Sequence, residues 1–491
     1  MKPEWQERWL LLLCAGILAW QLFLPGFIGM ANNGDFGKVA GPLSIGGADH
    51  GADNFIFFQP QYVRGAENYY IPKPPSSEIG LAWLASTVQK AVGGPARFDI
   101  RWLGAVHALI FLGFYYTVLV VLRPYGTAWR LALSLAALWI FADVGTLAYF
   151  NSFYMDVAAM LGALAATMLA VRLISTGEVR PAALGMFGAA ALVYVTSKGQ
   201  HGVLGFVPAL GALAFAVAAR HTKTRVLGCA VAVVVTAGSV WILESMPDWY
   251  RGQSRFDLIF FYITKNSPAP AQDLRELGLG DSDLRYVGTH AFMAGSPMAE
   301  RDFVTSFCER STYARVLAFY GRHPGVAAGK LWSDLRDMAP QRRPVNLSNF
   351  QRAQGMPAGA RTERLGLWSR LRSALFRLWP AHMVVWYGIA LVGFPLLGRR
   401  AGPGFRRSLA WVICAIAVAG AAEFGVASLA DAAETDRHLL LFHLLTDVTM
   451  FLALVWAASS STSGWRRSRD MGQEPVDAGQ ILRATAFPPA E

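Results

Sequence analysis

Charged residues are scarce in this chain. They make up 16% of its 491 residues, whereas 54% of the residues are hydrophobic. The chain has too many long apolar runs for one soluble core, which stops growing at about 250–300 residues. This composition therefore excludes an ordinary soluble protein.

Cysteine is also rare, and the four cysteines are far apart in the sequence. Cys14, Cys229 and Cys414 lie inside apolar runs, where cysteine behaves as a small hydrophobic residue. Cys308 stands alone in a polar segment. The spacing therefore indicates neither a disulfide nor a thiol-bound metal.

Several catalytic motifs are missing from the sequence. It has no Walker loop, dinucleotide-binding fingerprint, His-Glu-x-x-His zinc site or Gly-x-Ser-x-Gly nucleophile elbow in a supporting context. Energy or an activated sugar must then arrive in another form, such as a lipid carrier. The net charge of +11 needs no nucleic acid partner, because Lys and Arg gather in short loops, as the positive-inside rule predicts.

What the chain does have is a series of apolar segments, each long enough for a bilayer span of about 20 residues. They predict an all-α polytopic membrane protein with about ten transmembrane helices. The first run is longer than the roughly 7–15-residue core of a cleaved signal, so we interpret it as a retained helix. The predicted spans are Trp9–Gly29, Trp102–Leu122, Leu131–Tyr149, Met155–Ile174, Ala182–Thr196, Gly202–Ala219, Val226–Leu243, His382–Leu397, Leu409–Leu429 and Leu439–Ala458.

The spans divide the chain into helices and two long extracytoplasmic segments. Basic residues such as Arg123, Arg172 and Lys223 fall in alternate loops, which predicts that both termini are cytoplasmic. The segments are the first transmembrane helix (1–30), a first extracytoplasmic loop with an amphipathic helix (31–101), transmembrane helices 2–7 (102–243), an extracytoplasmic helical domain (244–380), transmembrane helices 8–10 (381–458) and a disordered cytoplasmic tail (459–491).

Both long segments contain helical patterns. Ser76 or Ser77 can cap a helix with Glu78 in its first turn. In the second segment, the pattern predicts a helix over Arg301–Tyr320, and Pro324 can begin another that runs to Met338. The apolar residues of the first helix place it on the membrane surface or against the bundle; they are Leu81, Leu84, Val88 and Val92.

The second long segment is rich in arginine. These residues either form a basic face for acidic glycans and lipid phosphates or, the interpretation we favour, a solvated surface. They are Arg342, Arg343, Arg352, Arg361, Arg364, Arg370, Arg372 and Arg377.

Asp35 is the most informative candidate residue. It follows the first span in the stretch Asn32-Asn33-Gly34-Asp35-Phe36-Gly37, so we expect its carboxylate just outside the bilayer. There it can meet a lipid-borne phosphate and a water-soluble hydroxyl at once. It acts as a general base or metal-assisted base, or it belongs to a helix C-terminal turn, which Asn, Gly and Asp favour.

Two short outer turns carry further candidates. Asn151 and Asp156 lie between two spans, and Asp156 either contacts substrate or stabilises the start of the next helix. Lys198 and His201 lie in Ser197-Lys198-Gly199-Gln200-His201. The lysine either binds phosphate as a point charge or extends to the membrane interface.

A third outer turn ends in Arg437 and His438. Arg437 suits bidentate phosphate recognition, and local salt bridges with Glu434 or Asp436 compete with that role. Together the three turns favour an active site that faces outward.

Ionisable residues also occur within the spans, where they are costly in lipid and should face the bundle interior. They suit a proton relay in a transporter or, as we favour, hydrogen bonds between helices. These residues are His107, Asp143, Glu423, His443 and Asp447.

The outer turns resemble those of the GT-C membrane glycosyltransferases, and they are most similar to the bacterial hexose transferase family implicated in surface-layer and cell-surface glycan assembly. The resemblance covers most of the chain in order. It is carried by Asn32–Gly37, Tyr149–Tyr154, Ser197–His201, Arg437-His438, and Arg255–Asp257 through Leu274–Leu279.

The resemblance implies a GT-C-like fold, a polyprenyl-phosphate-sugar donor and an outward-facing active site. It implies Asp35 as base or metal ligand and Asp156 as a second acidic position. Family members commonly continue with Gly-Glu-Pro after the Asn-Ser-Phe motif, whereas this chain has Met155-Asp156-Val157. A divalent metal, Mg²⁺ or Mn²⁺, at Asp35 stays open, because some of these enzymes need one and others do not.

The sequence thus predicts an inverting transfer of a sugar, a hexose by the resemblance, to a cell-envelope glycan or lipid-linked acceptor. The protein would lie among the lipids of the bacterial inner membrane. The alternatives are a secondary transporter or flippase for a glycan or lipid, and a non-catalytic scaffold. With Asp35 as catalytic residue, the residues expected to bind substrate or lipid phosphate are Asn33, Asn151, Asp156, Lys198, His201, Arg437 and His438.

Overall fold

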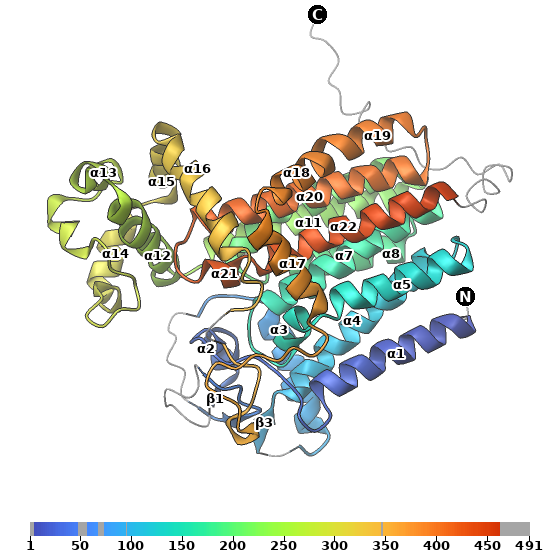
Figure 1. The fold of residues 1–491 in the computed structure, drawn as a ribbon, viewed down its shortest axis with the longest axis horizontal. Helices are drawn as coiled ribbons and strands as arrows, with labels where there is room; N and C mark the ends of the chain where they lie inside the picture. Colours follow the sequence, from blue (N-terminus) through green and yellow to red (C-terminus); the bar gives the residue numbers. More distant parts are fainter. Residues whose placement is uncertain (1–3, 48–55, 67–72, 95, 345–346, 462–491) are drawn as a thin grey trace, which may run out of the picture.

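The computed structural model describes residues 4–47, 56–66, 73–94, 96–344 and 347–461. Long helices lie side by side in a bundle, and shorter helices project from one end of it (Figure 1). This is the predicted all-α polytopic membrane architecture. Most of the predicted cytoplasmic tail, from residue 462 onward, lies outside the described residues.

Each predicted span overlaps one or more helices of the bundle, but fewer than the predicted ten are long and apolar enough to cross a membrane. Among the described residues, seven helices are long and apolar enough to cross a membrane, or eight if a bent pair counts as one span. The bundle consists of α1 (Trp5–Leu22), α4 (Arg101–Val121), α5 (Thr127–Phe141), α6 (Val144–Leu147), α7 (Asp156–Thr176), α8 (Pro181–Val195), α9 (Gly199–Gly202), α10 (Phe206–Ala218), α11 (Thr222–Glu244), α18 (His382–Gly388), α19 (Phe394–Arg400), α20 (Phe405–Leu429), α21 (Thr435–His438) and α22 (Leu440–Ala458).

The first and third predicted spans differ most from the observed helices. The first was expected to reach Gly29, but α1 ends at Leu22, and the chain beyond it pairs with another segment: the Ala31 N–H donates to the Ser348 carbonyl at 2.9 Å. The third span bends by 48° between α5 and α6. Asp143 caps α6 by accepting from the Gly145 N–H at 2.8 Å, which restarts the helix in a new direction.

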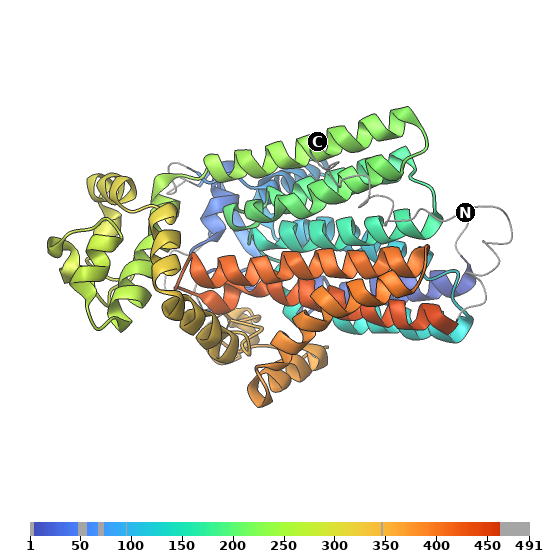
Figure 2. The same ribbon diagram turned by 90° about the horizontal axis from the view of Figure 1, so that it is seen from above.

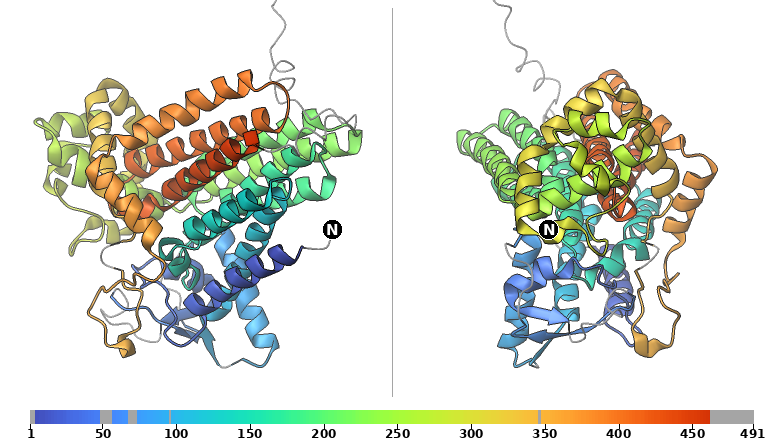
Figure 3. Two further views of the ribbon diagram at one scale, coloured as in Figure 1. Left: turned by 45° about the vertical axis from the view of Figure 1, so that its right-hand side comes forward. Right: turned by 90° about the vertical axis from the view of Figure 1, so that its left-hand side faces the viewer.

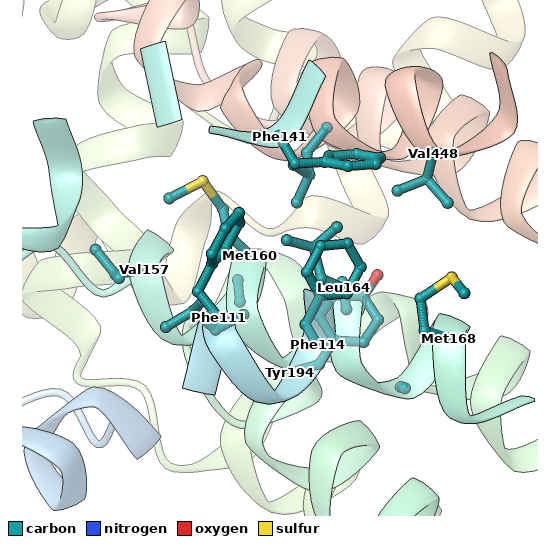
Figure 4. Packing of buried hydrophobic residues seen from close by; sticks show 14 of the residues in the cluster. Phe111, Phe114, Phe141, Val157, Met160, Leu164, Met168, Tyr194 and Val448 are labelled. Carbon is teal, nitrogen blue, oxygen red and sulfur yellow. The ribbon is translucent and has the colours of Figure 1, made fainter. Parts of the chain in front are cut away.

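The core of the bundle lies around α7 and α22. In each of these helices, 78% of the most apolar stretch is buried. Phe111 and Phe114 of α4 pack with Phe141 of α5 and Met160 of α7, close to Val448 of α22 (Figure 4). Both helices are packed on most sides. Asp156 begins α7, and Arg437 and His438 lie directly before α22, so candidate site residues lie at the starts of the two most buried helices.

The first long segment (31–101) combines short helices with a small sheet that the sequence did not indicate. Its three antiparallel strands are only three or four residues long, in the order β1-β2-β3, too short to show an apolar alternation. The elements are α2 (Phe36–Ala40), β1 (Ile45–Gly47), β2 (Gln61–Arg64), α3 (Ser77–Ala91) and β3 (Arg97–Asp99).

Helix α3 begins as predicted, because the Ser76 hydroxyl accepts from the Glu78 N–H at 3.1 Å. The helix packs against the bundle with one face and leaves apolar side chains exposed on the other, so it combines the two predicted placements, against the bundle and on the membrane surface. Glu78 is buried against α4, where it contacts the His107 imidazole at 2.9 Å. The apolar side chains of Leu84 and Val88 are exposed on the opposite face.

The second long segment (244–380) is helical, as expected, and has a hydrophobic core of its own that includes Phe256, Phe260 and Phe307. The predicted single helix over Arg301–Tyr320 was wrong, because Thr312 accepts from the Arg315 N–H at 3.2 Å and starts a new helix. Its helices are α12 (Asp248–Phe256), α13 (Pro270–Glu276), α14 (Arg301–Arg310), α15 (Tyr313–Arg322), α16 (Pro324–Ser333) and α17 (Leu367–Leu378).

Short 3-10 and π-helical turns complete the structure. One of them extends α16 to the predicted end at Met338. The turns are η1 (Gly41–Leu43), η3 (Ala148–Phe150), η4 (Val203–Gly205), η5 (Asp257–Ile263), η6 (Thr264–Asn266), η7 (Asp281–Tyr286), η8 (Pro297–Ala299), η9 (Asp334–Met338), η10 (Arg352–Gln354), η11 (Ile389–Gly393) and η12 (Ser459–Ser461).

Both long segments lie at the same end of the bundle, which we call the loop end. The start of α1 and the end of α22 lie at the opposite end (Figures 1 and 2). Figure 3 shows the helices of the second segment in front when the molecule is viewed from the loop end. The arrangement agrees with two termini on the same side of a membrane.

The ionisable residues within the spans mostly make the hydrogen bonds between elements that we favoured. His107 binds Glu78, Asp143 accepts from the Ser369 N–H at 3.0 Å, and Glu423 accepts from Gln200 at 2.6 Å. His443 is the exception: its ring nitrogens have no hydrogen-bond partner among the described residues.

Two arginines of the second segment are not the solvated residues we expected. Arg372 is buried and Arg342 is partly buried, and both contact the Asp447 carboxylate, Arg342 at 2.6 Å and Arg372 at 3.2 Å. Each arginine lies outside the apolar spans in sequence, so the sequence alone gave no sign that α17 folds back onto α22.

Candidate functional site

Asp35 is positioned by a turn between α1 and α2. The Asn32 side-chain oxygen accepts from the Gly34 and Phe36 N–H groups at 2.8 and 3.1 Å. Gly34 has φ of 104°, a conformation that glycine adopts without strain. The stretch leads into α2, and α1 ends at Leu22, so a helix C-terminal turn is wrong here.

The Asp35 carboxylate lies between two cations. It contacts the Lys38 Nζ at 2.5 Å and the Arg437 Nη2 at 2.8 Å, and its side chain is 15% exposed. Burial by itself would raise the pKa of Asp35, but the charges of Lys38 and Arg437 outweigh it and hold the pKa well below the usual range. Asp35 is therefore ionised at neutral pH and keeps some access to the outside.

Arg437 connects Asp35 to other acidic residues. Its guanidinium lies 3.0 Å from Glu434 and 3.8 Å from Asp156, and its carbon lies 5.4 Å from the centre of the Tyr154 ring. The side chain is only 5% exposed. The predicted competition from Glu434 thus occurs, but it does not remove Arg437 from Asp35.

A second group of charges lies beneath Arg437. Asp156 at the start of α7 is 3.3 Å from the Lys198 Nζ and 3.6 Å from His201 Nε2. His201 Nδ1 in turn lies 3.2 Å from Glu423 of α20. All four side chains are buried, so α7, α9 and α20 are joined by charged groups next to the Asp35 pair.

Asn33 and His438 lie at the edges of this cluster. The Asn33 amide donates to Glu434 at 2.6 Å. His438 Nε2 lies 3.4 Å from the Arg437 guanidinium, and its Nδ1 lies 3.8 Å from Asp431. Burial raises the pKa of Asp431.

Asn151 lies apart from the charges and has a different task from the one predicted. Its amide donates to the backbone carbonyls of Leu22 and Ile28, at 3.0 and 2.7 Å. These bonds hold the chain between the end of α1 and the Asp35 turn. The structure thus corrects the expected substrate contact to a backbone contact inside the protein.

We call the set Asp35, Lys38, Asp156, Lys198, His201, Glu423, Glu434 and Arg437 the charged cluster. Sequence reasoning missed Lys38, whose only signal was its place three residues after Asp35. It also assigned Glu423 to the span interior, because the contact with His201 depends on how α20 packs.

The charged cluster does not supply a ready metal site. Among the described residues, one group of His, Cys, Asp or Glu ligand atoms is close enough together to hold an ion, and it consists of Asp273, Glu276 and His323. Those residues lie in the second segment, and Glu276 is already paired with Arg322 at 3.0 Å. Asp35 is held by cations instead, so we derive no step through a metal.

The geometry of the cluster suits chemistry between an anion and a hydroxyl group. Lys38, Lys198 and Arg437 are fixed cations that can stabilise a phosphate. Asp35 is an ionised carboxylate with some exposure, which can accept a proton. All four lie in or directly before the short helices α2, α9 and α21.

A family model described as the YfdI N-terminal transmembrane domain matches residues 5–475. The match covers the bundle, both long segments and every residue of the charged cluster. No curated protein and no solved structure matches the chain.

Proposed function

The chain belongs to the YfdI N-terminal transmembrane domain family, and we propose that it is a membrane glycosyltransferase of the GT-C type. It moves a sugar, a hexose by the resemblance of its turns, from a polyprenyl-phosphate donor to a cell-envelope glycan or lipid-linked acceptor. The observation that carries the proposal is the partly exposed Asp35 carboxylate, 2.8 Å from Arg437 and 2.5 Å from Lys38.

The proposed reaction is a direct displacement at the anomeric carbon. Asp35 removes the proton from the acceptor hydroxyl, whose oxygen forms a bond to the sugar carbon as the bond to the phosphate oxygen breaks. The electron pair of that bond leaves with the lipid phosphate, which is a stable anion and needs no proton. Arg437 and Lys198 stabilise the charge that develops on it, and the attack from the opposite face inverts the configuration.

The low pKa of Asp35 in this arrangement has a consequence for the order of events. A carboxylate paired with two cations is a weak base. When a phosphate takes over contacts with Arg437, Asp35 loses part of that stabilisation and becomes more basic. Donor binding would therefore activate the base, so that the acceptor is deprotonated only when a donor is present.

The orientation in the membrane is part of the proposal. Arg123 and Arg130, which follow α4, pair with Glu7 and Glu4 at the start of α1, and the start of α1 lies at the end of the bundle opposite the two long segments (Figure 1). By the positive-inside rule that end faces the cytoplasm. Both termini are then cytoplasmic, and the reaction occurs at the extracytoplasmic face of the bacterial inner membrane.

The proposal is tested by the mass of the cell-surface glycan. A deletion strain should lack one sugar, and the wild-type gene should restore it. Asp35→Asn should not restore it, although the variant protein is present in the membrane. Asp248→Asn, at an exposed aspartate of the second segment, is the matched control and should restore it. Full restoration by Asp35→Asn would contradict the proposal.

A flippase or transporter is the second candidate, and one observation favours it: His201 joins Glu423 to Asp156 inside the bundle, as a proton relay would require. A flippase changes how much glycan reaches the surface without changing its structure. Three results would together favour this candidate. The deletion strain would lack whole glycan units, Glu423→Gln would not restore them, and Asp35→Asn would restore them.

A further inference from the structure

Helix α17 turns polar side chains toward the bundle. The Trp368 indole donates to the Asp447 carboxylate of α22 at 2.9 Å, and Arg372 lies 3.2 Å from the same carboxylate. The Ser369 N–H donates to Asp143 at 3.0 Å. Asp447 lies in a candidate membrane span, and Asp143 lies at the bend between α5 and α6. These contacts fix α17 against the part of the protein that crosses the membrane.

The outward face of α17 is apolar. Four leucines recur every three or four residues, which places them on one side of the helix, and their exposed fractions run from 36% to 84%. A helix between a protein core and water turns its apolar row toward the core, whereas α17 turns the row away. The surroundings of this face are therefore apolar rather than aqueous. The four residues, which we call the leucine row, are Leu367, Leu371, Leu375 and Leu378.

Two exposed arginines border the leucine row. Arg370 and Arg377 are about two helical turns apart, so they lie along the same edge of the row. Arg370 lies 3.6 Å from Glu363 in an exposed pair, which contributes little. Arg377 makes no ion pair among the described residues. An apolar row with cations at its edge is typical of a helix in the membrane interface, where the apolar residues enter the acyl chains and the cations meet headgroups.

The place of α17 in the chain also points to the membrane surface. Only residues 379–381 separate it from His382, where a candidate span begins. Trp379 at this junction is exposed, and tryptophan is enriched where a span meets the headgroups. The span continues with the exposed apolar residues Val384 and Val385. Helix α17 runs across the bundle helices rather than along them (Figure 1), as a helix in the plane of the membrane would.

We propose that α17 is an interfacial helix that binds the membrane surface. Its leucine row enters the acyl chains, and Arg377, with Arg370 beside it, contacts anionic lipid headgroups. Lipid suits this face better than a second copy of the chain, because the leucine row leads directly into the exposed residues of a span and the bordering charges are cations. The helix ends the second segment, so it anchors that segment to the membrane. This role needs no sugar transfer.

The test places a photoreactive benzophenone amino acid at position 371 of the full-length protein in nanodiscs of phosphatidylcholine and phosphatidylglycerol. Leu371 is 49% exposed, so its replacement removes little packing. The same group at Val384 of the span is the positive control. At Arg275 of α13, which lies far from the bundle (Figure 1), it is the negative control.

After illumination, mass spectrometry should find lipid adducts at positions 371 and 384, and at least about tenfold fewer at position 275, because only the first two reach the acyl chains. Adducts as rare at 371 as at 275 would overturn the membrane contact. Crosslinked dimers in place of lipid adducts would show that a second copy covers the face, and would overturn the lipid assignment.

The headgroup contact is tested by the ratio of phosphatidylglycerol to phosphatidylcholine adducts at position 371. Arg377→Gln should lower this ratio by about fivefold, the equivalent of one basic contact with an anionic surface. Arg275→Gln makes the same change of charge at an exposed residue of α13 and should leave the ratio unchanged. An unchanged ratio in Arg377→Gln would overturn the headgroup contact. Transfer activity is not measured, so the outcome is independent of the proposed function.

Discussion

Replacing Arg437 with glutamine removes a cation that contacts both Asp35 and Asp156. In the wild type its guanidinium lies 2.8 Å from Asp35, 3.0 Å from Glu434 and 3.8 Å from Asp156. Glutamine keeps a hydrogen-bonding side chain but loses the charge. Three carboxylates would then share fewer cations in a largely buried place, and this should destabilise the folded protein.

The size of the effect follows from the partners that remain. Removing one member of a buried ion pair costs about 3–5 kcal/mol, because a buried charge is left uncompensated. Here Asp35 keeps Lys38 and Asp156 keeps Lys198. We therefore expect the lower end, about 3 kcal/mol, which corresponds to a melting temperature lower by about 3 °C for a chain of this length.

The assay is thermal unfolding of purified protein in detergent, followed by tryptophan fluorescence. Arg437→Lys should lie between wild type and Arg437→Gln, because lysine keeps the charge without the planar fork of donors. Arg275→Gln breaks an exposed pair with Asp281 and should change nothing measurable. If Arg437→Gln melts together with the Arg275 variant, the buried network around Arg437 is wrong.

Two other predictions concern buried groups away from Arg437. His107→Leu leaves Glu78 buried without its partner at 2.9 Å, so the protein should lose about 3–5 kcal/mol of stability and its melting temperature should fall. The double variant His107→Leu with Glu78→Gln should recover part of this loss. No recovery would mean that the two side chains are not coupled. Burial, with a contribution from the charge of Asp431, raises the pKa of Asp257 from 3.8 to about 8. The folded state then holds this proton more tightly than the unfolded state, so stability is lost as pH rises from about 4 to 8. Thermal melts across this range should show a flatter pH dependence for Asp257→Asn than for wild type, and identical slopes would contradict the assignment.

The helices of the bundle could be predicted from sequence because the membrane demands long apolar runs. The ends of the helices were less predictable. The apolar run after Leu22 suits both a helix and the paired chain that Ala31 forms with Ser348. Asp143 lies in an apolar run, and only its bond to Gly145 reveals that the helix restarts there.

Most of the candidate site was also within reach of the sequence. The turns that carry Asp35, Asp156, Lys198 and Arg437 were found because polar residues interrupt apolar runs at one end of the spans. The structure brings these four residues together, as the interpretation of an outward-facing site required.

Residues whose role depends on packing between distant segments could not be assigned. Asn151 has the same local sequence whether it contacts substrate or, as observed, the carbonyls of Leu22 and Ile28. Arg342 and Arg372 were expected to be solvated, because nothing in the sequence indicates that α17 folds back on Asp447.

The most direct test of the central claim is the transfer rate of purified protein with a radiolabelled polyprenyl-phosphate sugar and a glycan acceptor. If Asp35 is the base, Asp35→Asn should lower the rate by about 10²–10⁴-fold, while the protein stays folded and still binds the donor. A folded Asp35→Asn protein that transfers sugar at the wild-type rate would contradict the account.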